Sequence, residues 1–298
     1  MMNSQFDLAP IIIFAYNRIN HLESCINALK TNDESKFSLL IIYCDGPKNE
    51  NDISNVQKVR DYITTITGFK EIQFKISNIN KGLSRSIING ITEQFQIYNK
   101  LIILEDDILV SKYFLFYMNS SLELYKDSHN VASIHGYCYP IKKLPATFFI
   151  KGADCWGWAT WKRSWNEFEL DGNILLENLI NNKLKYEFNL FGAYNYTKML
   201  KNQILKKNDS WAIRWHASNF ISNKLTLYPG KSLVKNIGTD GSGTNFVSTD
   251  FSFETSFYNN KTEINLIKIK ENKRARNYFI IFFYKRKINL LIKKLFKF

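Results

Sequence analysis

Short apolar runs and amphipathic stretches alternate along the first 130 residues of the chain. Continuous apolar runs rich in β-branched residues occur at 10–16 (PIIIFAY), 39–44 (LLIIYC) and 101–104 (LIIL). Runs of this kind are typical of strands buried on both faces of a sheet. Residues 71–76 (EIQFKI) alternate between apolar and polar, which predicts one more strand.

Helical periodicity fills the intervals between these strands. Four segments are predicted to be helical: 22–29, 56–66, 83–95 and 115–125. Asn20 is the predicted N-cap of the first helix, and Ser111 that of the last. The alternation predicts an α/β fold, Rossmann-like, with a mostly parallel central sheet flanked by helices.

The pattern changes after Val131. Residues 171–207 are polar and helical in period, and six tryptophans occur between 156 and 215. Indoles are first of all core material, so at least half of the six are expected to be structural. No internal repeat and no linker divides the chain into two domains.

Three adjacent carboxylates, Glu105, Asp106 and Asp107, follow the strand at 101–104. Buried acids that repel one another need a counter-charge, and a divalent cation such as Mn²⁺ or Mg²⁺ is the expected one. A metal held by so few protein groups usually neutralises a diphosphate. The alternative is a solvated turn whose acids face the N-terminus of the next helix.

Polar residues also follow the first two strands. Arg18 comes after the strand at 10–16, and Asp45 comes directly after the strand at 39–44. In parallel sheets, ligands bind beyond the carboxyl ends of the strands. We therefore expect these residues and the acidic triplet to share one ligand site.

The net charge of +13 is concentrated in the C-terminal tail. After Glu271 the chain has nine Lys and Arg residues and no acid, which leaves +4 for the rest. The apolar run 278–284 (YFIIFFY) is too short to span a bilayer, so the tail predicts a basic amphipathic helix on an anionic membrane surface. Nucleic-acid binding would not need its long aliphatic residues, and a docking helix is the remaining alternative.

The four cysteines show no metal-type spacing, and Cys25 and Cys44 lie in apolar segments, as buried reduced thiols do. The start of the chain, MMNSQFDLAP, has no basic stretch followed by a long apolar run, so no secretory signal is expected. These features predict a cytoplasmic protein that associates peripherally with the inner face of the cell membrane.

Six segments in a fixed order resemble the GT-A glycosyltransferases, most closely the bacterial family 2-like enzymes that are similar to eukaryotic N-acetylglucosaminyltransferase I. The segments are PIIIFAYNR, IIYCDGP, NKGLSRSIINGI, LIILEDDILVS, CWGWATWKRSW and NIGTDGSGTN. The resemblance implies metal-dependent, inverting transfer of a sugar from a nucleotide-diphosphate donor, UDP-linked, to a surface polysaccharide or lipid-linked oligosaccharide. It also implies a GT-A domain over 1–250 and an extension over 251–298. Within that domain, 8–130 would bind the nucleotide and 131–250 the donor sugar and acceptor.

The resemblance implies a role for each polar group at the strand ends. Asp107 would be the direct metal ligand, and Glu105 and Asp106 would face the ribose and the sugar. Asp45 would hydrogen-bond the nucleotide base, and Arg18 would lie near the nucleotide.

Two further segments would contact the donor. Asn80, Lys81 and Arg85 occur where the family has a nucleotide-contacting turn before a helix. A helix N-terminus with two cations suits a diphosphate, although surface solvation is the alternative for both cations. Trp156 and Gly157 resemble the floor under the donor sugar.

The catalytic base is where the sequence departs from the family. The related eukaryotic enzyme carries an acid between two tryptophans in a WDDW stretch, whereas 209–216 (DSWAIRWH) has none there. Asp209 is the nearest candidate, and it could instead cap a helix. The others are Asp154, which would also contact the sugar, Asp240 and His216.

Two alternatives to an active transferase follow from the same residues. The missing acid leaves open a catalytically impaired relative that still binds sugar nucleotides or membranes. A sugar-phosphate nucleotidyltransferase usually needs a glycine-rich phosphate loop after the first strand, and FAYNRINHLE has no glycine. The segment 238–245 (GTDGSGTN) predicts either a turn cluster or a loop that closes over the donor and excludes water.

Overall fold

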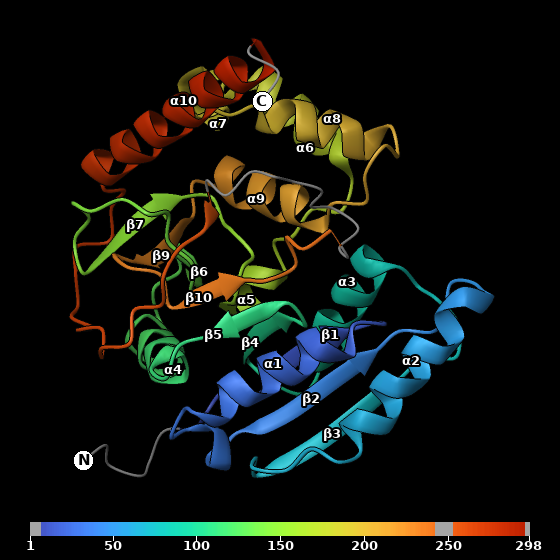
Figure 1. Ribbon diagram of the computed structural model, residues 1–298. Helices are drawn as coiled ribbons and strands as arrows, with labels where there is room; N and C mark the ends of the chain where they lie inside the picture. The colour runs from blue at the N-terminus through green and yellow to red at the C-terminus, as the bar shows by residue number, and fades with distance from the viewer. Residues whose placement is uncertain (1–6, 242–252, 296–298) are drawn as a thin grey trace.

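The computed structural model describes residues 7–241 and 253–295. Its centre is an eight-stranded sheet (Figure 1). In order across the sheet, the strands are β3 (Glu71–Ile76), β2 (Leu39–Cys44), β1 (Ile11–Ala15), β4 (Lys100–Glu105), β8 (Trp158–Trp161), β6 (Val131–His135), β9 (Leu225–Pro229) and β7 (Thr147–Lys151). The first four are parallel; β1, β2 and β4 are the strands that the apolar runs predict, and β3 is the one that the alternating segment predicts.

The other half of the sheet mixes directions. β8 is antiparallel to both of its neighbours, β4 and β6, while β6 and β9 are parallel and β7 is antiparallel to β9. The antiparallel register pairs Trp158 at the start of β8 with Ile103 near the end of β4. Residues just before Trp158 therefore lie along the same sheet edge as residues just after Glu105.

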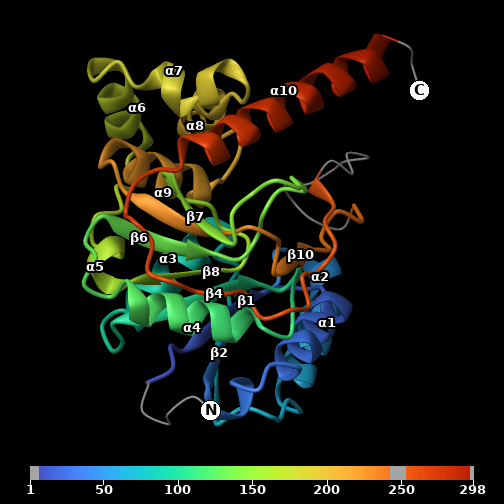
Figure 2. The ribbon, with the colours of Figure 1, turned by 90° about the vertical axis from the view of Figure 1, so that its left-hand side faces the viewer.

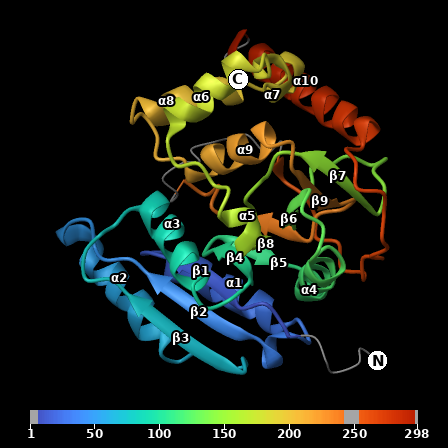
Figure 3. The same cartoon turned by 180° about the vertical axis from the view of Figure 1, so that it is seen from behind.

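Helices cover both faces of the sheet (Figure 3). The core of one face is shared with α1 (Ile19–Lys30), α2 (Glu50–Ile63) and α4 (Phe114–Leu124), and that of the other with α3 (Leu83–Gln94) and α9 (Trp211–Ile221). In β1, Ile11 and Ile13 face the first core and Ile12 the second, as strand alternation requires.

A second, two-stranded sheet lies beside the end of β4. It pairs β5 (Ile108–Val110) antiparallel with β10 (Val234–Asn236). The remaining elements are η1 (Ser35–Phe37), α5 (Lys162–Trp165), α6 (Gly172–Asn181), α7 (Lys185–Phe188), η2 (Leu190–Gly192), α8 (Tyr196–Ile204) and α10 (Lys273–Leu295). Helices α6 to α9 share a small core of their own above the sheet.

The predicted fold class is confirmed: a mostly parallel central sheet is flanked by helices, and a C-terminal helix follows it. All four cysteines are free, and Cys25 and Cys44 are buried as predicted. Both predicted helix caps are wrong, because α1 begins after Arg18 and α4 after Tyr113, neither of which makes a side-chain cap bond.

The C-terminal segment joins the main core. Ile264, Ile267 and Ile269 pack against it, and Phe279 and Phe283 of α10 are buried in it. The domain boundary at residue 250 lies outside the described residues and stays a prediction. No helix in the described part of the chain combines the length and apolarity needed to cross a membrane.

Candidate active site

The carboxyl ends of β1, β2 and β4 meet at one edge of the sheet. Ala15 pairs with Cys44, and Phe14 pairs with Glu105, so the three strands end level with one another. The residues that follow them, Arg18 among them, are brought together as predicted. In parallel sheets this edge is where ligands bind.

Arg18 is the counter-charge of the acidic triplet. Its Nη2 donates to Oδ1 of Asp106 and, over 2.9 Å, to Oδ2 of Asp107. The Asp106 side chain is only 4% exposed. Burial raises the pKa of both Glu105 and Asp106, and the Arg18 charge opposes that rise. Without Arg18, the buried Asp106 carboxylate would be left without a counter-charge beside the partly buried carboxylate of Asp107.

The second terminal nitrogen of Arg18 has a different environment. Nη1 is buried, and no hydrogen-bond partner for it lies among the described residues. A buried guanidinium donor is costly to leave unpaired, and anions such as phosphate are its strongest partners. Nη1 therefore marks a position where an anionic ligand would be stabilised.

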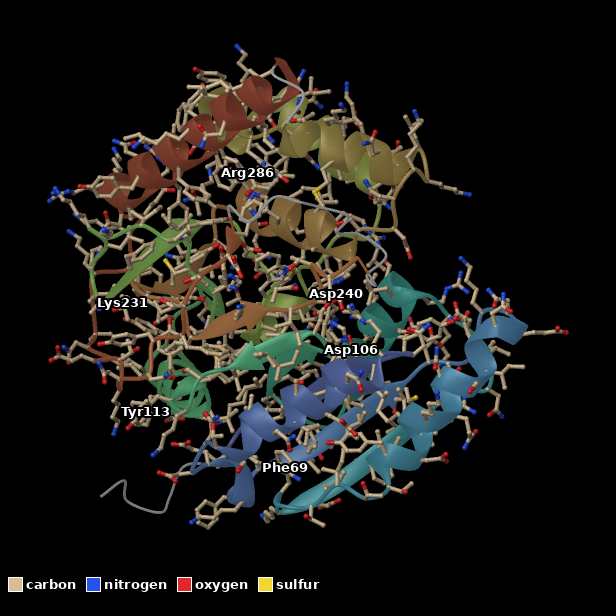
Figure 4. The ribbon with its side chains drawn as sticks, viewed as in Figure 1. Phe69, Asp106, Tyr113, Lys231, Asp240 and Arg286 are labelled. Atoms are coloured by element: carbon tan, nitrogen blue, oxygen red, sulfur yellow. The ribbon has the colours of Figure 1, made fainter. Side chains whose placement is uncertain are left out.

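The chain after β10 packs directly on this ion pair. Ile237 N–H donates to the Asp107 backbone carbonyl over 2.9 Å. A Cβ added to Gly238 would lie 2.2 Å from Asp107 Oδ2 and 3.1 Å from Arg18 Nη1, so any larger residue there would displace the ion pair. Asp240 then meets His21 of α1, with 3.2 Å between Oδ2 and Nε2. Figure 4 shows Asp106 and Asp240 close together in the centre of the molecule.

The Asp45 carboxylate is hydrogen-bonded to other groups of the chain. It accepts hydrogen bonds from the backbone N–H groups of Lys81 (2.9 Å) and Gly82 (3.0 Å) and from the Ser86 hydroxyl (3.2 Å). These bonds hold the turn before α3 against the end of β2. Its predicted contact with the nucleotide base stays a prediction, and a positioning role is what the geometry supports.

The turn before α3 presents its cations to solvent. Asn80 is tied down, because its Nδ2 donates to the Gly46 carbonyl over 2.8 Å. The side chains of Lys81 and Arg85 are exposed beside the N-terminus of α3. They are free to move toward an anion at the strand ends, and their predicted role is untested.

Asp154 lies in the loop between β7 and β8, on the site edge of the sheet. Its Oδ1 accepts from Cys155 N–H over 2.9 Å, and its Oδ2 is 3.7 Å from Nε2 of His135. His135 is fully buried, and neither ring nitrogen has a hydrogen-bond partner among the described residues. Burial lowers its pKa to about 4, although the Asp154 charge acts in the opposite direction. His135 is therefore neutral at pH 7.

The His135 environment predicts a pH-dependent stability. The unfolded chain binds a proton at His135 below about pH 6.5 and the folded chain only below about pH 4, so the free energy of unfolding falls as pH falls through this window, by up to about 3 kcal/mol. His135→Phe should flatten the dependence of the melting temperature on pH between 6.5 and 4. The exposed His129→Gln is the control. An unchanged slope in His135→Phe would contradict the assignment.

Asp209 does not cap α9. Ser210 is the N-cap, and its hydroxyl accepts from Ile213 N–H over 3.3 Å. Asp209 is exposed and faces the start of α3, with its Oδ2 3.8 Å from the position of a Cβ on Gly82. The capping alternative for Asp209 is therefore wrong. Its carboxylate lies beside the turn before α3 that contains Lys81.

Most of the tryptophans are core residues. Five of the six are buried, and four of these pack against one another in the core shared with α3: Trp158, Trp165, Trp211 and Trp215. Trp156 is only partly buried and contacts the Tyr137 ring at 4.8 Å. Gly157 has φ +60°, and a Cβ there would come within 2.8 Å of Val234. The predicted role of Trp156 and Gly157 as the floor under the donor sugar stays a prediction.

His216 is a structural residue. Its Nδ1 is 2.7 Å from the Ala153 carbonyl oxygen, and its ring packs on Tyr196 at 4.6 Å. Burial lowers its pKa. Through this contact with Ala153, it holds the backbone next to Asp154 in place.

The acids at the site fit a hard divalent cation. Within residues 7–241 and 253–295, no group of three or more His, Cys, Asp and Glu side chains has the arrangement of a metal site. A metal that bridges a diphosphate needs only one or two carboxylates, however, because phosphate and water fill its other positions. One guanidinium nitrogen reaches oxygens of both Asp106 and Asp107. The two oxygens therefore flank a single cation position.

No protein-family model matches the chain, and no curated protein matches its sequence. Solved structures similar to part of it include the following two. TarS from S. aureus matches with a TM-score of 0.36 and 12% identity over 52% of this chain and 28% of that one. The mannosyltransferase PcManGT from Pyrobaculum calidifontis, in complex with GDP-Man and Mn²⁺, matches with a TM-score of 0.30 and 11% identity over 48% of this chain and 40% of that one. The chain thus spans less than half the length of either.

Proposed function

We propose that this chain is a metal-dependent glycosyltransferase of the GT-A type. It would transfer a sugar, with inversion, from a UDP-linked donor to a surface polysaccharide or a lipid-linked oligosaccharide. The observation that carries the proposal is the Arg18, Asp106 and Asp107 cluster at the strand ends. It combines hard oxygen ligands for a cation with a buried, unpaired donor for an anion. A diphosphate with its metal is the ligand that needs both.

Asp107 would bind Mn²⁺ or Mg²⁺ directly, and the more buried Asp106 would lie next to Asp107. The metal would neutralise the charge that develops on the leaving diphosphate. Arg18 would turn from the carboxylates to a phosphate oxygen, which gives its Nη1 the partner it lacks. Asp45 would hold the turn that brings Lys81 toward the same phosphates.

Asp209 is the proposed general base. Inverting transfer requires a carboxylate that takes the acceptor proton on the face opposite the diphosphate. Asp209 is exposed to an incoming acceptor, whereas Asp154 is hydrogen-bonded to its own loop and backed by His135. None of the residues between Trp211 and Trp215 is an acid, so the proposed base is taken from the chain before this helix.

Asn substitutions separate the two carboxylates. Asp209→Asn should lower kcat by about 10²–10⁴-fold while Mn²⁺-dependent donor binding stays unchanged. Asp154→Asn should mainly raise KM for the donor, because it removes a contact to the sugar. Transfer rates and donor affinities of both variants are the measurement. A full kcat in Asp209→Asn would exclude it as the base.

The function itself is tested by donor hydrolysis. The protein is incubated with Mn²⁺ and a panel of UDP-, GDP- and dTDP-sugars, and the released nucleoside diphosphate is measured with and without EDTA. We expect release from at least one UDP-sugar that depends on Mn²⁺. Donor binding without turnover or transfer to any acceptor would instead favour the impaired relative. Release of pyrophosphate from a nucleoside triphosphate and a sugar phosphate would favour a nucleotidyltransferase.

A further inference from the structure

Helix α10 has two halves with different surroundings. In the first half, Ala275, Phe279 and Phe283 are buried, and Phe279 contacts the rings of Tyr139 and Tyr228 at 4.8 and 5.7 Å. Arg276 is fixed by Glu271 over 2.7 Å. The aromatic run 278–284 is therefore largely a docking element. The prediction that this run lies on a membrane is wrong for Phe279 and Phe283, because both are buried in the protein.

The second half leaves the body of the protein. Figure 2 shows α10 extending away from the other helices toward its C-terminal end. Ile281, Ile288 and Ile292 are 49%, 54% and 47% exposed. At 100° per residue, positions i, i+7 and i+11 fall on one face of a helix. The outer side of α10 is thus an apolar stripe that no described part of the chain covers.

One lysine borders this stripe. At about 100° per residue, Lys285 lies within about 40° of Ile281 around the helix, whereas Lys287 lies about 120° away, on the side that lines a groove with Asn195 and Lys198. Both lysines are exposed, and the sequence has no acid after Glu271. Tyr284 fixes the direction of this half, because its hydroxyl donates to the Phe191 carbonyl over 2.7 Å. The apolar stripe and Lys285 are therefore held in place together by the body.

We propose that the outer side of α10, from Ile281 to Ile292, docks on the surface of an anionic lipid bilayer. The isoleucines would enter the boundary between headgroups and acyl chains, and Lys285 would contact lipid phosphates. A second copy of the chain is a poorer occupant, because two such cationic helices repel each other. Nucleic acid would pair with the lysines but would leave the isoleucines in water. The proposal is independent of the reaction at the strand ends.

Vesicle flotation of the full chain tests the proposal. Binding should be strong to vesicles that contain phosphatidylglycerol and weak to those of phosphatidylcholine alone. The double variant Ile288→Ser, Ile292→Ser should weaken it by tenfold or more, and Lys285→Gln by about fivefold, at about 1 kcal/mol per lysine. Ile180→Ser, at a 55% exposed isoleucine on α6, is the matched control. Equal melting temperatures establish that the variants are folded.

Several outcomes would overturn the proposal. One is equal binding to both kinds of vesicle or to neither. Another is unchanged vesicle binding by the isoleucine variant, which would reduce the interaction to charge alone. A dimer in solution that the isoleucine substitutions dissociate would identify a second copy as the occupant. Tighter binding to a DNA or RNA oligonucleotide than to anionic vesicles would identify nucleic acid.

Discussion

Asp107→Asn is expected to remove metal-dependent donor binding almost completely. The substitution keeps the shape of the side chain but removes the charge that a divalent cation requires. The Arg18 Nη2 contact at 2.9 Å can persist with the amide oxygen, so the local fold should hold. We expect Mn²⁺-dependent affinity for a nucleoside diphosphate to fall by about 100-fold or more, and turnover with it.

Calorimetric titration of UDP in the presence of Mn²⁺ measures this loss. Asp33→Asn, at an exposed aspartate, is the matched control and should bind like the unmodified chain. If Asp107→Asn retains Mn²⁺-dependent UDP binding within a factor of two, Asp107 is not the metal ligand.

Arg18→Gln should have opposite effects on the two ligands. The guanidinium and a divalent cation compete for the same carboxylate oxygens of Asp106 and Asp107. Removing it should raise the affinity for Mn²⁺ alone and lower that for UDP alone, each by about tenfold. In the unmodified chain, therefore, Mn²⁺ and UDP should each strengthen the binding of the other by the same factor.

The same substitution should lower stability when no metal is present. It leaves the buried Asp106 carboxylate beside Asp107 without a counter-charge, which typically lowers the free energy of unfolding by about 3 kcal/mol. Added Mn²⁺ should restore part of this loss. Arg18→Lys keeps the charge but not the planar fork, so its effects should be intermediate.

Electron paramagnetic resonance of free Mn²⁺ measures the affinity for the metal directly, without turnover. Equal Mn²⁺ affinity in Arg18→Gln and the unmodified chain would contradict the competition. A failure of nucleotide binding in both proteins would contradict the proposed function instead, so the two ideas are separable.

Three strands of the parallel half, β1, β2 and β4, could be predicted because they are buried on both faces, and the edge strand β3 because it alternates. Ile11 to Ile13 and Leu40 to Ile42 are entirely apolar, as such strands must be. β6 could not be predicted in the same way, since Ser133 interrupts its apolar run. The structure makes that residue acceptable, because its hydroxyl pairs with that of Thr226 across the strands at 2.6 Å. A pairing over 93 residues of sequence leaves no local signal.

The site was predictable in its position but not in its internal pairing. Strand ends gave the location of Arg18, Asp45 and the triplet, whereas the ion pair depends on where α1 begins. The hydrogen bonds that the Asp45 carboxylate accepts come from the turn at Lys81, which is 36 residues away in sequence. His21 and His135 were missed, because each matters only through a partner far away in sequence. The second half of the predicted closing loop, 242–245, lies outside the described residues.

Thermal unfolding with UDP, GDP, Mn²⁺ and their combinations tests most directly whether the strand ends bind a metal together with a diphosphate. A ligand present at 100 times its Kd raises the free energy of unfolding by about 2.7 kcal/mol, which for a chain of this size is a shift on the order of 5 °C. We predict that shift for one nucleotide with Mn²⁺, a much smaller one for either alone, and none in Asp107→Asn. No shift with any combination, or the same shift in Asp107→Asn, would contradict the account.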